Sequence, residues 1–413
     1  MTEHGTSWSG SGSRQRTRSH NAAAIAIALA ALGASSPAAA QESRAATIAS
    51  AQAEKAARVT PYQPSRAEAA LERAFDLLTL PPNGFYPVFG SVYSGGGFTL
   101  GGGYRRFVTE RTTVNFTGMY SIKSYKLFEV GLQRPRDARR PYDVSVTAGW
   151  RDATQVNYHG LGIESPEDRT VYRMKQGYAG GELAYRPKPW TIFRGAITYE
   201  GFTLSEGSGS VTSIEEVHTP ATAPGLGANP DYLHLNASAA IDTRPSPGYA
   251  RRGLLYEIGY HRYDDRDDVY TFDRVDADIV HHIPILRENW VVSLHGRLES
   301  TLSDTDVVPY FLLPSLGSGS TLRGYSSWRF RDRHAALFSG EFRWIPSRLV
   351  MDAALFYDTG TVADRFDSLS INRMKSDVGV GVRFHTPLAT PLRIELAKGS
   401  EGLRLVFAGS AAF

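Results

Sequence analysis

The sequence predicts an all-β fold, a 16-stranded antiparallel transmembrane β-barrel with a short N-terminal periplasmic helix. Three observations predict it: short segments alternate apolar and polar side chains from residue 85 onward, the N-terminus resembles an export leader, and the chain has 0 cysteines. Alternation indicates strands, because successive side chains of a strand point to opposite faces. A soluble sandwich alternates in the same way, so the leader is what favours a membrane barrel.

Residues 1–40 are organised like a signal peptide. Arginines within residues 14–18 precede an apolar run over residues 22–32, and the small residues 37–40 form a cleavage pattern before Gln41. The run of about eleven residues is shorter than the roughly twenty that a transmembrane helix needs. The alternative interpretation is a basic tail with a chance alanine run. We expect export through this leader and residence in the outer membrane of a Gram-negative cell.

Residues 41–82 are predicted to be a periplasmic linker. They are rich in Ala, Glu, Arg and Gln, and residues 67–80 carry apolar side chains at helical spacing before Pro81 and Pro82. Two interpretations stay open: a partly ordered linker, or a short amphipathic helix docked on or in the barrel mouth. Such a segment of about forty residues is shorter than a typical folded domain.

Residues 85–413 are predicted to be the barrel. A single-chain bacterial barrel needs an even number of strands so that both ends return to the periplasm, and a tilted strand spans the bilayer with about ten residues. The segments that fit are residues 85–93, 98–107, 112–122, 124–134, 142–156, 171–186, 190–204, 232–242, 253–263, 269–283, 290–302, 335–345, 349–358, 375–385, 391–398 and 402–413.

The two faces of these segments differ in chemistry. In the segment 335–345, Phe338 and Phe342 share one face, whereas Glu341 and Arg343 share the other. A barrel wall is apolar toward lipid and polar toward the lumen, so the charged face is expected to point inward.

The connections alternate between long and short. Residues 205–230 and 303–334 form long stretches, whereas the proline-containing turns 186–189, 345–347 and 386–387 are short. Long connections are typical of the outer side of such barrels and short ones of the periplasmic side. Proline cannot donate to a strand ladder, so its confinement to turns agrees with the strand positions.

The composition argues against several classes of function. The chain has 45 basic and 42 acidic residues, and removal of the leader takes three arginines and one glutamate, so nothing favours a nucleic-acid partner. The absence of cysteine excludes disulfides and thiolate metal sites. We find no Gly-x-Ser-x-Gly motif and no histidine pair at metal spacing. We therefore predict no enzyme, no catalytic residues, no cofactor and no metal.

Three clusters of polar residues could bind a metal, a lipid or a partner protein, but for each we favour ordinary wall or solvent-exposed residues. His281 and His282 point to opposite faces of a strand, so they cannot share one metal without a bulge. Residues 264–268 could hold cations that bridge lipopolysaccharide, or form a solvated outer loop. Residues 134–140 could contact anionic lipid or a periplasmic partner, or form a solvated turn.

Arg323 is the candidate functional residue. It lies in the long stretch 303–334, and a loop guanidinium that stays inside a barrel needs a planar carboxylate partner. Alternation places Glu341 and Asp358 on the inward faces of neighbouring strands, and Gly324 allows a sharp turn or a close approach to the wall. We call the predicted contact of Arg323 with these carboxylates the lumen lock. The alternative interpretation is a solvated arginine with unrelated wall charges.

The motifs resemble those of the BamA/TamA-like outer-membrane assembly and secretion proteins, also called the bacterial surface antigen family. Leu322-Arg323-Gly324-Tyr325 resembles the signature at the tip of the sixth outer loop, which in the family folds back into the lumen. The run from Phe356 to Gly360 is similar to the FxDxG motif, whose aspartate faces the arginine of the loop. Further matches are residues 157–162, where His159 departs from the pattern, residues 242–244, and the C-terminal Leu405, Phe407 and Phe413.

The resemblance implies a machine that inserts or translocates proteins through a weak seam between its first and last strands. Pro87, the glycines within residues 90–103 and Gly409 would weaken that seam. The implied partners are outer-membrane lipids including lipopolysaccharide, an unfolded outer-membrane or secreted client protein, and a periplasmic partner.

The chain departs from its full-length relatives because it has no room for periplasmic POTRA domains, so we expect a short branch. A barrel partner of a lipolytic or lipid-handling system and a passive pore are the alternatives.

Overall fold

The computed structural model describes residues 46–52, 54, 73, 83–286, 288–304, 307–346 and 350–413. The chain divides into two compact units, residues 1–66 and 67–413. Residues 46–52 of the first unit are helical. The predicted signal peptide, and the predicted helix over residues 67–80 apart from helical Arg73, lie outside the described residues. No helix among the described residues is long and apolar enough to cross a membrane.

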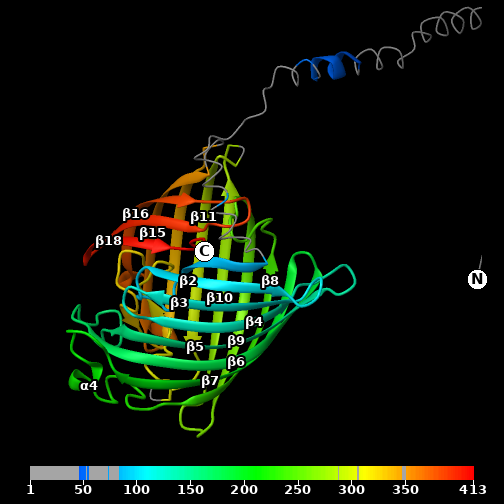
Figure 1. Ribbon diagram of the computed structural model, residues 1–413. Coiled ribbons are helices and arrows are strands. Elements are labelled where there is room, and N and C mark those ends of the chain that lie inside the picture. Colours follow the sequence, from blue (N-terminus) through cyan, green and yellow to red (C-terminus); the bar gives the residue numbers. More distant parts are fainter. Residues whose placement is uncertain are drawn as a thin grey trace, which may run out of the picture. The chain divides into compact units, whose positions relative to one another are not determined.

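The second unit contains one 16-stranded antiparallel sheet whose strands pair in sequence order, curled into a nearly closed barrel (Figure 1). This confirms the predicted fold, and each predicted strand corresponds to one strand of the sheet. The strands are β1 (Gly84–Gly90), β2 (Thr99–Phe107), β3 (Thr113–Ser121), β4 (Lys126–Arg134), β5 (Tyr142–Tyr158), β6 (Thr170–Lys188), β7 (Thr191–Glu206), β8 (Asp231–Asp242), β9 (Gly253–Asp265), β10 (Phe272–Pro284), β11 (Trp290–Thr301), β14 (His334–Trp344), β15 (Met351–Ala363), β16 (Lys375–Phe384), β17 (Leu392–Gly399) and β18 (Gly402–Ala408).

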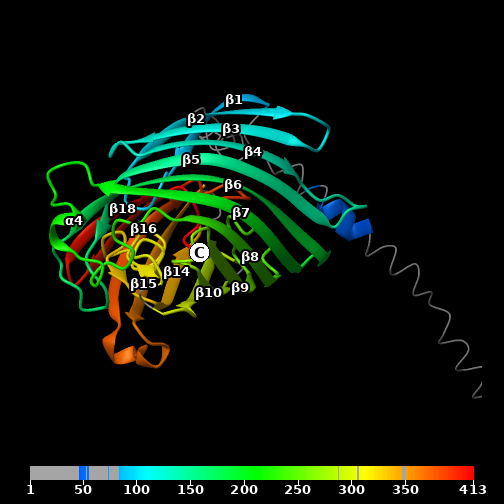
Figure 2. The same ribbon diagram turned by 90° about the horizontal axis from the view of Figure 1, so that it is seen from below.

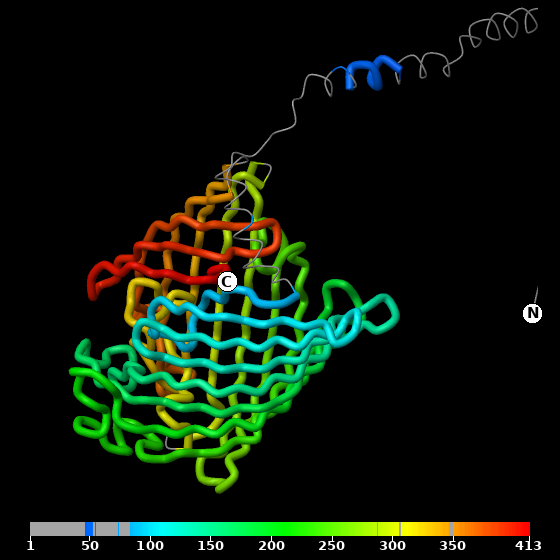
Figure 3. Tube along the Cα trace, in the orientation of Figure 1, coloured from blue at the N-terminus to red at the C-terminus, as the bar shows by residue number. Residues whose placement is uncertain are grey.

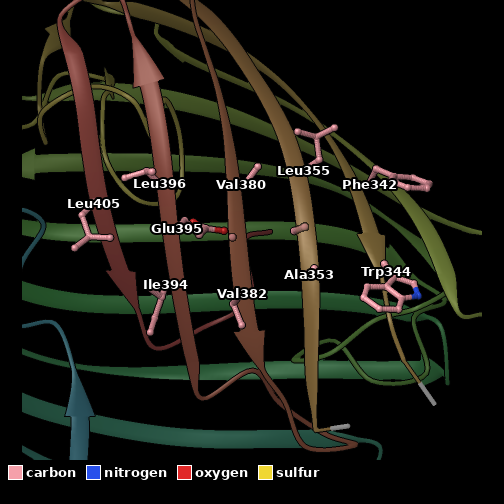
Figure 4. A pocket seen from close by; sticks show the side chains of 12 residues that line it. Phe342, Trp344, Ala353, Leu355, Val380, Val382, Ile394, Glu395, Leu396 and Leu405 are labelled. Carbon is pink, nitrogen blue, oxygen red and sulfur yellow. The ribbon is translucent and has the colours of Figure 1, made fainter. Parts of the chain in front are cut away.

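The two faces of the wall follow the predicted alternation. Along β14, Phe338 and Phe342 are exposed on the outside, whereas Ser339, Glu341 and Arg343 are buried on the inside. Figure 4 shows the outer face of β14–β18, where Phe342 and other apolar side chains surround a shallow groove of about 500 Å³. An apolar outer face with a polar inner face is the arrangement that a lipid-embedded wall requires.

The wall differs in height around the barrel. β5, β6 and β7 have 17, 19 and 16 residues, whereas β1, β17 and β18 have only 7, 8 and 7. At about 3.3 Å per residue, the long strands run for roughly 50–60 Å and the short ones for roughly 25 Å. The wall is therefore lowest at the two edges of the sheet.

The long connections gather at one end of the barrel, which we call the loop end, and the short ones at the other, the turn end. The connection between β7 and β8 at the loop end contains the short helix α4 (Ile214–Val217) (Figure 2). Loop side chains and inward side chains of β5–β10 form a hydrophobic core inside the barrel, including Tyr158, Tyr172, Phe202 and Tyr310. The loop end is thus packed rather than lined only by wall residues.

The first and last strands do not form a ladder among the described residues, so β1 and β18 are the free edges of the sheet. Figure 3 shows the C-terminal end close to β1, and a Cβ placed on Gly409 would lie 3.8 Å from the Cα of Gly90. We call this unpaired junction the seam.

The prediction that the last strand reaches Phe413 is wrong. β18 ends at Ala408, and the ring of Phe413 stacks on the inward-facing His295 with centroids 4.9 Å apart. The cause is visible on the neighbouring strand, where Arg393 Nε donates to the carbonyl of Ser410 at 2.7 Å. That bond draws the chain end off the sheet edge and into the barrel.

Candidate functional site in the barrel lumen

The connection between β11 and β14 folds back into the barrel and carries Arg323. A two-stranded ladder of β12 (Ser315–Leu316) and β13 (Phe330–Arg331) closes its base. Beyond the ladder, Leu322 and Tyr325 pack with Leu337 and Val362 of the wall. We call residues 315–331 the lumen loop. Its apolar side chains anchor it, because burying each of them removes apolar surface from water.

Arg323 is 2% exposed and lies against three wall carboxylates. Its Nε and Nη2 donate to the two oxygens of Asp358 at 2.7 and 2.8 Å, a bidentate pair. Its Nη1 donates to Glu341 at 3.3 Å and to Glu395 at 3.1 Å. The structure therefore brings together the three charged residues that the sequence singled out, and adds Glu395.

Three further arginines join the same cluster. Arg383 on β16 donates to both oxygens of Glu341 and to Glu395 at 3.0 Å. Arg393 on β17 donates to Glu395 at 2.6 Å and to the loop carbonyl of Gly319 at 3.0 Å. Arg343 on β14 lies 3.7 Å from Glu341 and 4.0 Å from Asp352, so with Arg323 and Asp358 four cations face four carboxylates. This balance matters because a buried charge without a partner is strongly destabilising.

Close packing of the backbone positions the cluster. A Cβ on Gly324 would lie 2.5 Å from the Cβ of Asp377 and 2.7 Å from the backbone nitrogen of Gly399, so the loop touches the wall there. A Cβ on Gly360 would lie 2.7 Å from Leu316 of the loop. The sequence left two roles open for Gly324, a sharp turn or a close approach to the wall. The structure shows the close approach, because Gly324 is not among the glycines with a positive φ.

Aromatic side chains complete the site. The guanidinium of Arg323 lies 3.4 Å from the ring centroid of Phe356, a cation–π arrangement. Tyr325 places its hydroxyl 3.1 Å from Oγ of Ser400 and donates to the carbonyl of Ser376 at 3.2 Å. A Cβ on Gly399 would lie 2.9 Å from the Tyr325 ring, so this glycine leaves the space that the ring occupies.

The lumen loop contacts both sides of the seam. On the β1 side, Trp328 donates from Nε1 to the carbonyl of Ser94 at 3.0 Å and stacks on Tyr93. On the β18 side, Arg329 donates to Glu401 at 2.5 Å, and Tyr325 reaches the same connection. The connections beside two edges that form no ladder among the described residues are therefore joined through the loop.

The glycine turn after β5 also supports the loop. Gly160 and Gly162 both have φ of 90°, a conformation that glycine adopts at little cost. The amide of Gly162 donates to the carbonyl of Arg331, and Nε2 of His159 lies 3.2 Å from Oγ of Ser326. Burial, reinforced by nearby Arg329, lowers the pKa of His159 to about 4. His159, the residue at which this chain departs from the glycine-turn motif of residues 157–162, is therefore a neutral imidazole.

The remaining candidate residues lie elsewhere. Leu405 and Phe407 are exposed on the outer face of β18, and Phe413 lies inside the barrel. His282 is buried and His281 is exposed, as expected for opposite faces. In the part of the chain that the structure describes, no group of three or more histidine, aspartate or glutamate side chains could hold a metal ion.

Sequence reasoning missed Arg383, Arg393, Glu395 and the stacking role of Phe356. Alternation along β16 and β17 could have found the three charged residues, since all three are buried and point inward. Alternation alone could not have shown that they converge on the loop, because that depends on where the loop tip lies.

The sequence matches the family model described as the Omp85 superfamily domain over residues 96–402. The chain belongs to the Omp85 superfamily. No curated protein matches the sequence. Barrels of this superfamily insert or translocate proteins at the outer membrane of Gram-negative bacteria, which agrees with the outer-membrane, protein-handling role expected from the motifs.

Solved structures agree with the fold of this Omp85 barrel. It is similar to BamA from Haemophilus ducreyi lacking POTRA domains 1–3, with 16% identity, a TM-score of 0.57, and coverage of 80% of this chain and 70% of that one. It is also similar to CdiB from Escherichia coli, with 11% identity, a TM-score of 0.55, and coverage of 79% and 62%. The chain thus spans less than two thirds of that CdiB chain.

Proposed function

We propose that this Omp85 barrel inserts or translocates client polypeptides through the seam between β1 and β18, and that the lumen loop controls the seam. The observation that carries the proposal is the position of the loop, which contacts Ser94 on one side of the unpaired edges and Glu401 on the other. While the loop is docked it joins the edges, and when it leaves they are free to separate.

The chemistry of a free edge supports this role. An unpaired strand presents a row of amide and carbonyl groups that can pair with an incoming strand. β1 and β18 are also among the shortest strands, so the lipid-facing wall beside the seam is low. A client strand that adds to the edge satisfies its backbone groups without crossing lipid unpaired.

The packed lumen argues against the passive pore. The guanidinium of Arg323 and the hydrophobic core that contains Tyr310 and Phe311 occupy space through which solutes would pass.

We further propose that the clients are unfolded outer-membrane or secreted proteins, that lipopolysaccharide contacts the outer surface, and that residues 1–40 direct export. Omp85 barrels are in general not enzymes, and we propose none of the enzymatic roles for this one.

The test is the folding rate of an unfolded client barrel into preformed liposomes with and without this protein. We expect the native chain to accelerate folding, and both Arg323→Ala and Asp358→Ala to lose most of the acceleration. Arg297→Ala is the matched control, because this lumen arginine is 41% exposed and its ion pairs among the described residues are with Glu299 and Asp278, neither of which belongs to the lumen loop.

Each variant must first be shown to be folded, for example by its altered gel mobility without heating. Acceleration that survives in both lock variants would contradict the role of the loop. No acceleration by the native chain would contradict insertion and direct attention to the lipid-handling alternative.

A further inference from the structure

The connection between β8 and β9 extends across the turn end of the barrel. Gly248 forms a parallel bridge with Ala389, in the turn between β16 and β17, although four strands separate β9 from β16 in the sheet. Ser246 donates from Oγ to the carbonyl of Pro387 at 3.0 Å, and Thr390 donates to the carbonyl of Gly248 at 3.1 Å. We call residues 243–252 the strap.

Gly248 allows this crossing. A Cβ at that position would lie 2.4 Å from the carbonyl oxygen of Leu388, so a larger residue would push the strap away. Arg343 of the inner wall also donates to the carbonyl of Ala250 on the strap. The strap is therefore held by both the turn and the wall.

A cavity of about 580 Å³ lies where the strap meets the neighbouring turns. Its charged and polar lining includes Arg251 and Arg252 of the strap, Glu288 of the β10–β11 turn, and His385 and Thr386 after β16, together with Ser246 and Tyr249. A volume of several hundred cubic ångströms is the usual size of a small-molecule site.

The described residues that line the cavity carry an excess of positive charge. Arg252 lies 3.3 Å from Glu288, which offsets one cation. Arg251 forms no ion pair with any residue that the structure describes, and its guanidinium lies 5.1 Å from the ring centroid of Tyr249. The unbalanced guanidinium favours an anionic ligand, because its fork of donors matches oxyanions.

His385 supplies a second, independent observation. Its side chain lines the cavity, the residue is only 6% exposed, and neither ring nitrogen has a hydrogen-bond partner among the described residues. Tyr249 stacks on the imidazole with centroids 4.0 Å apart and holds its orientation. Burial, with Arg251 nearby, lowers the pKa of His385 to about 4, so the ring is neutral and offers one N–H donor. Buried polar groups are normally paired, so ring nitrogens without a described side-chain partner are available to a ligand in the cavity.

We propose that this cavity binds a phosphate group, with Arg251 as the main cation and His385 as a buried hydrogen-bond donor. Thr386 and the Arg252–Glu288 pair form its rim. The phosphate is either free in solution or part of a phospholipid headgroup, since the cavity lies at the end of the strands. This site goes beyond the proposed insertion function and does not depend on it.

The test uses the full-length protein purified in a non-phosphate detergent, with two probes. Binding of inorganic phosphate is followed by broadening of its ³¹P resonance, and binding of phosphatidylglycerol is followed by native mass spectrometry. We expect saturable binding in at least one arm, and the arm that binds more tightly identifies the source. Arg251→Gln is expected to weaken that binding about tenfold or more, because a charged hydrogen bond is lost.

Two variants keep the result interpretable. Arg251→Lys retains the charge and is expected to retain more binding than Arg251→Gln, which separates ligand contact from a folding defect. Arg266→Gln removes an arginine that is 74% exposed at the loop end and is expected to bind like the native chain. The proposal is overturned by no saturable binding in either arm, or by equal losses in Arg251→Gln and Arg266→Gln. His385→Ala without any loss would remove the histidine from the site.

Discussion

Arg323→Ala should release the lumen loop from the wall. The substitution leaves Asp358, which is 0% exposed, without its bidentate partner, while Arg383 still pairs with Glu341 and Glu395. Removing one partner of a buried ion pair costs about 3–5 kcal/mol. At about 1.4 kcal/mol per tenfold change, the undocked fraction should rise roughly 140- to 3,700-fold.

Cysteine labelling can measure that fraction, because the native chain has 0 cysteines. Ser326 is 8% exposed and lies on the lumen loop, so Ser326→Cys introduces a thiol that is protected while the loop is docked. When reclosure is faster than modification, the labelling rate by a soluble maleimide follows the undocked population. The ratio of rates with and without Arg323→Ala then gives the change in docking free energy.

Two controls sharpen the measurement. Arg297→Ala, in the same background, removes a partly exposed pair that contributes about 0.2–1 kcal/mol and should change the rate less than about fivefold. Adding Asp358→Asn to Arg323→Ala removes the unpaired charge and should restore part of the protection. Equal labelling rates for Arg323→Ala and Arg297→Ala would refute the reasoning that the buried pair holds the loop.

Three further predictions follow from the same geometry. A double variant Gly90→Cys and Gly409→Cys should form a disulfide across the seam and block client insertion until reduced; undiminished activity of the oxidised form would contradict lateral opening. Gly324→Ala should destabilise loop docking by about 1–3 kcal/mol through overpacking, measured by labelling, whereas Gly296→Ala, which has open space, should not. When the loop is docked, the pKa of His159 is about 4, whereas an exposed imidazole has a pKa of about 6.5. As the pH falls below about 6.5, His159 therefore takes up a proton more readily in the undocked state. Docking should weaken by up to about 3 kcal/mol toward pH 4. Hydrogen exchange of the loop, corrected for intrinsic rates, measures this loss, and His159→Gln should remove the part of the pH dependence that comes from this imidazole.

Strand positions could be predicted closely because alternation reports a local property. Each of the sixteen segments corresponds to a strand, and the inward face of β14 was identified from Glu341 and Arg343 alone. Two strand ends were wrong by five residues: β15 continues to Ala363 instead of ending at residue 358, and at the C-terminus residues 409–413 leave the sheet. Alternation continues through Phe407, but the bond from Arg393 to Ser410 comes from another strand and leaves no local pattern.

The site was predictable in part for the same reason. Arg323 and Asp358 stand in short motifs, and their faces follow from parity, so their meeting could be expected from the sequence. Glu395 and Trp328 belong to no such motif. Their roles depend on where the loop tip lies, 72 residues from Glu395 in the chain and across the seam from β1.

The sequence by itself determined that this chain forms a sixteen-stranded wall with an apolar outside and a polar inside, because side-chain alternation and turn residues act over a few neighbouring positions. The tertiary structure decided that the seam stays unpaired, that the lumen loop joins its two edges, and that the strap crosses the turn end to form a cationic cavity. Those features arise from contacts between residues far apart in the chain, such as Arg329 with Glu401 and Gly248 with Ala389. Only a wall that is curled into a nearly closed barrel brings such residues within hydrogen-bonding distance.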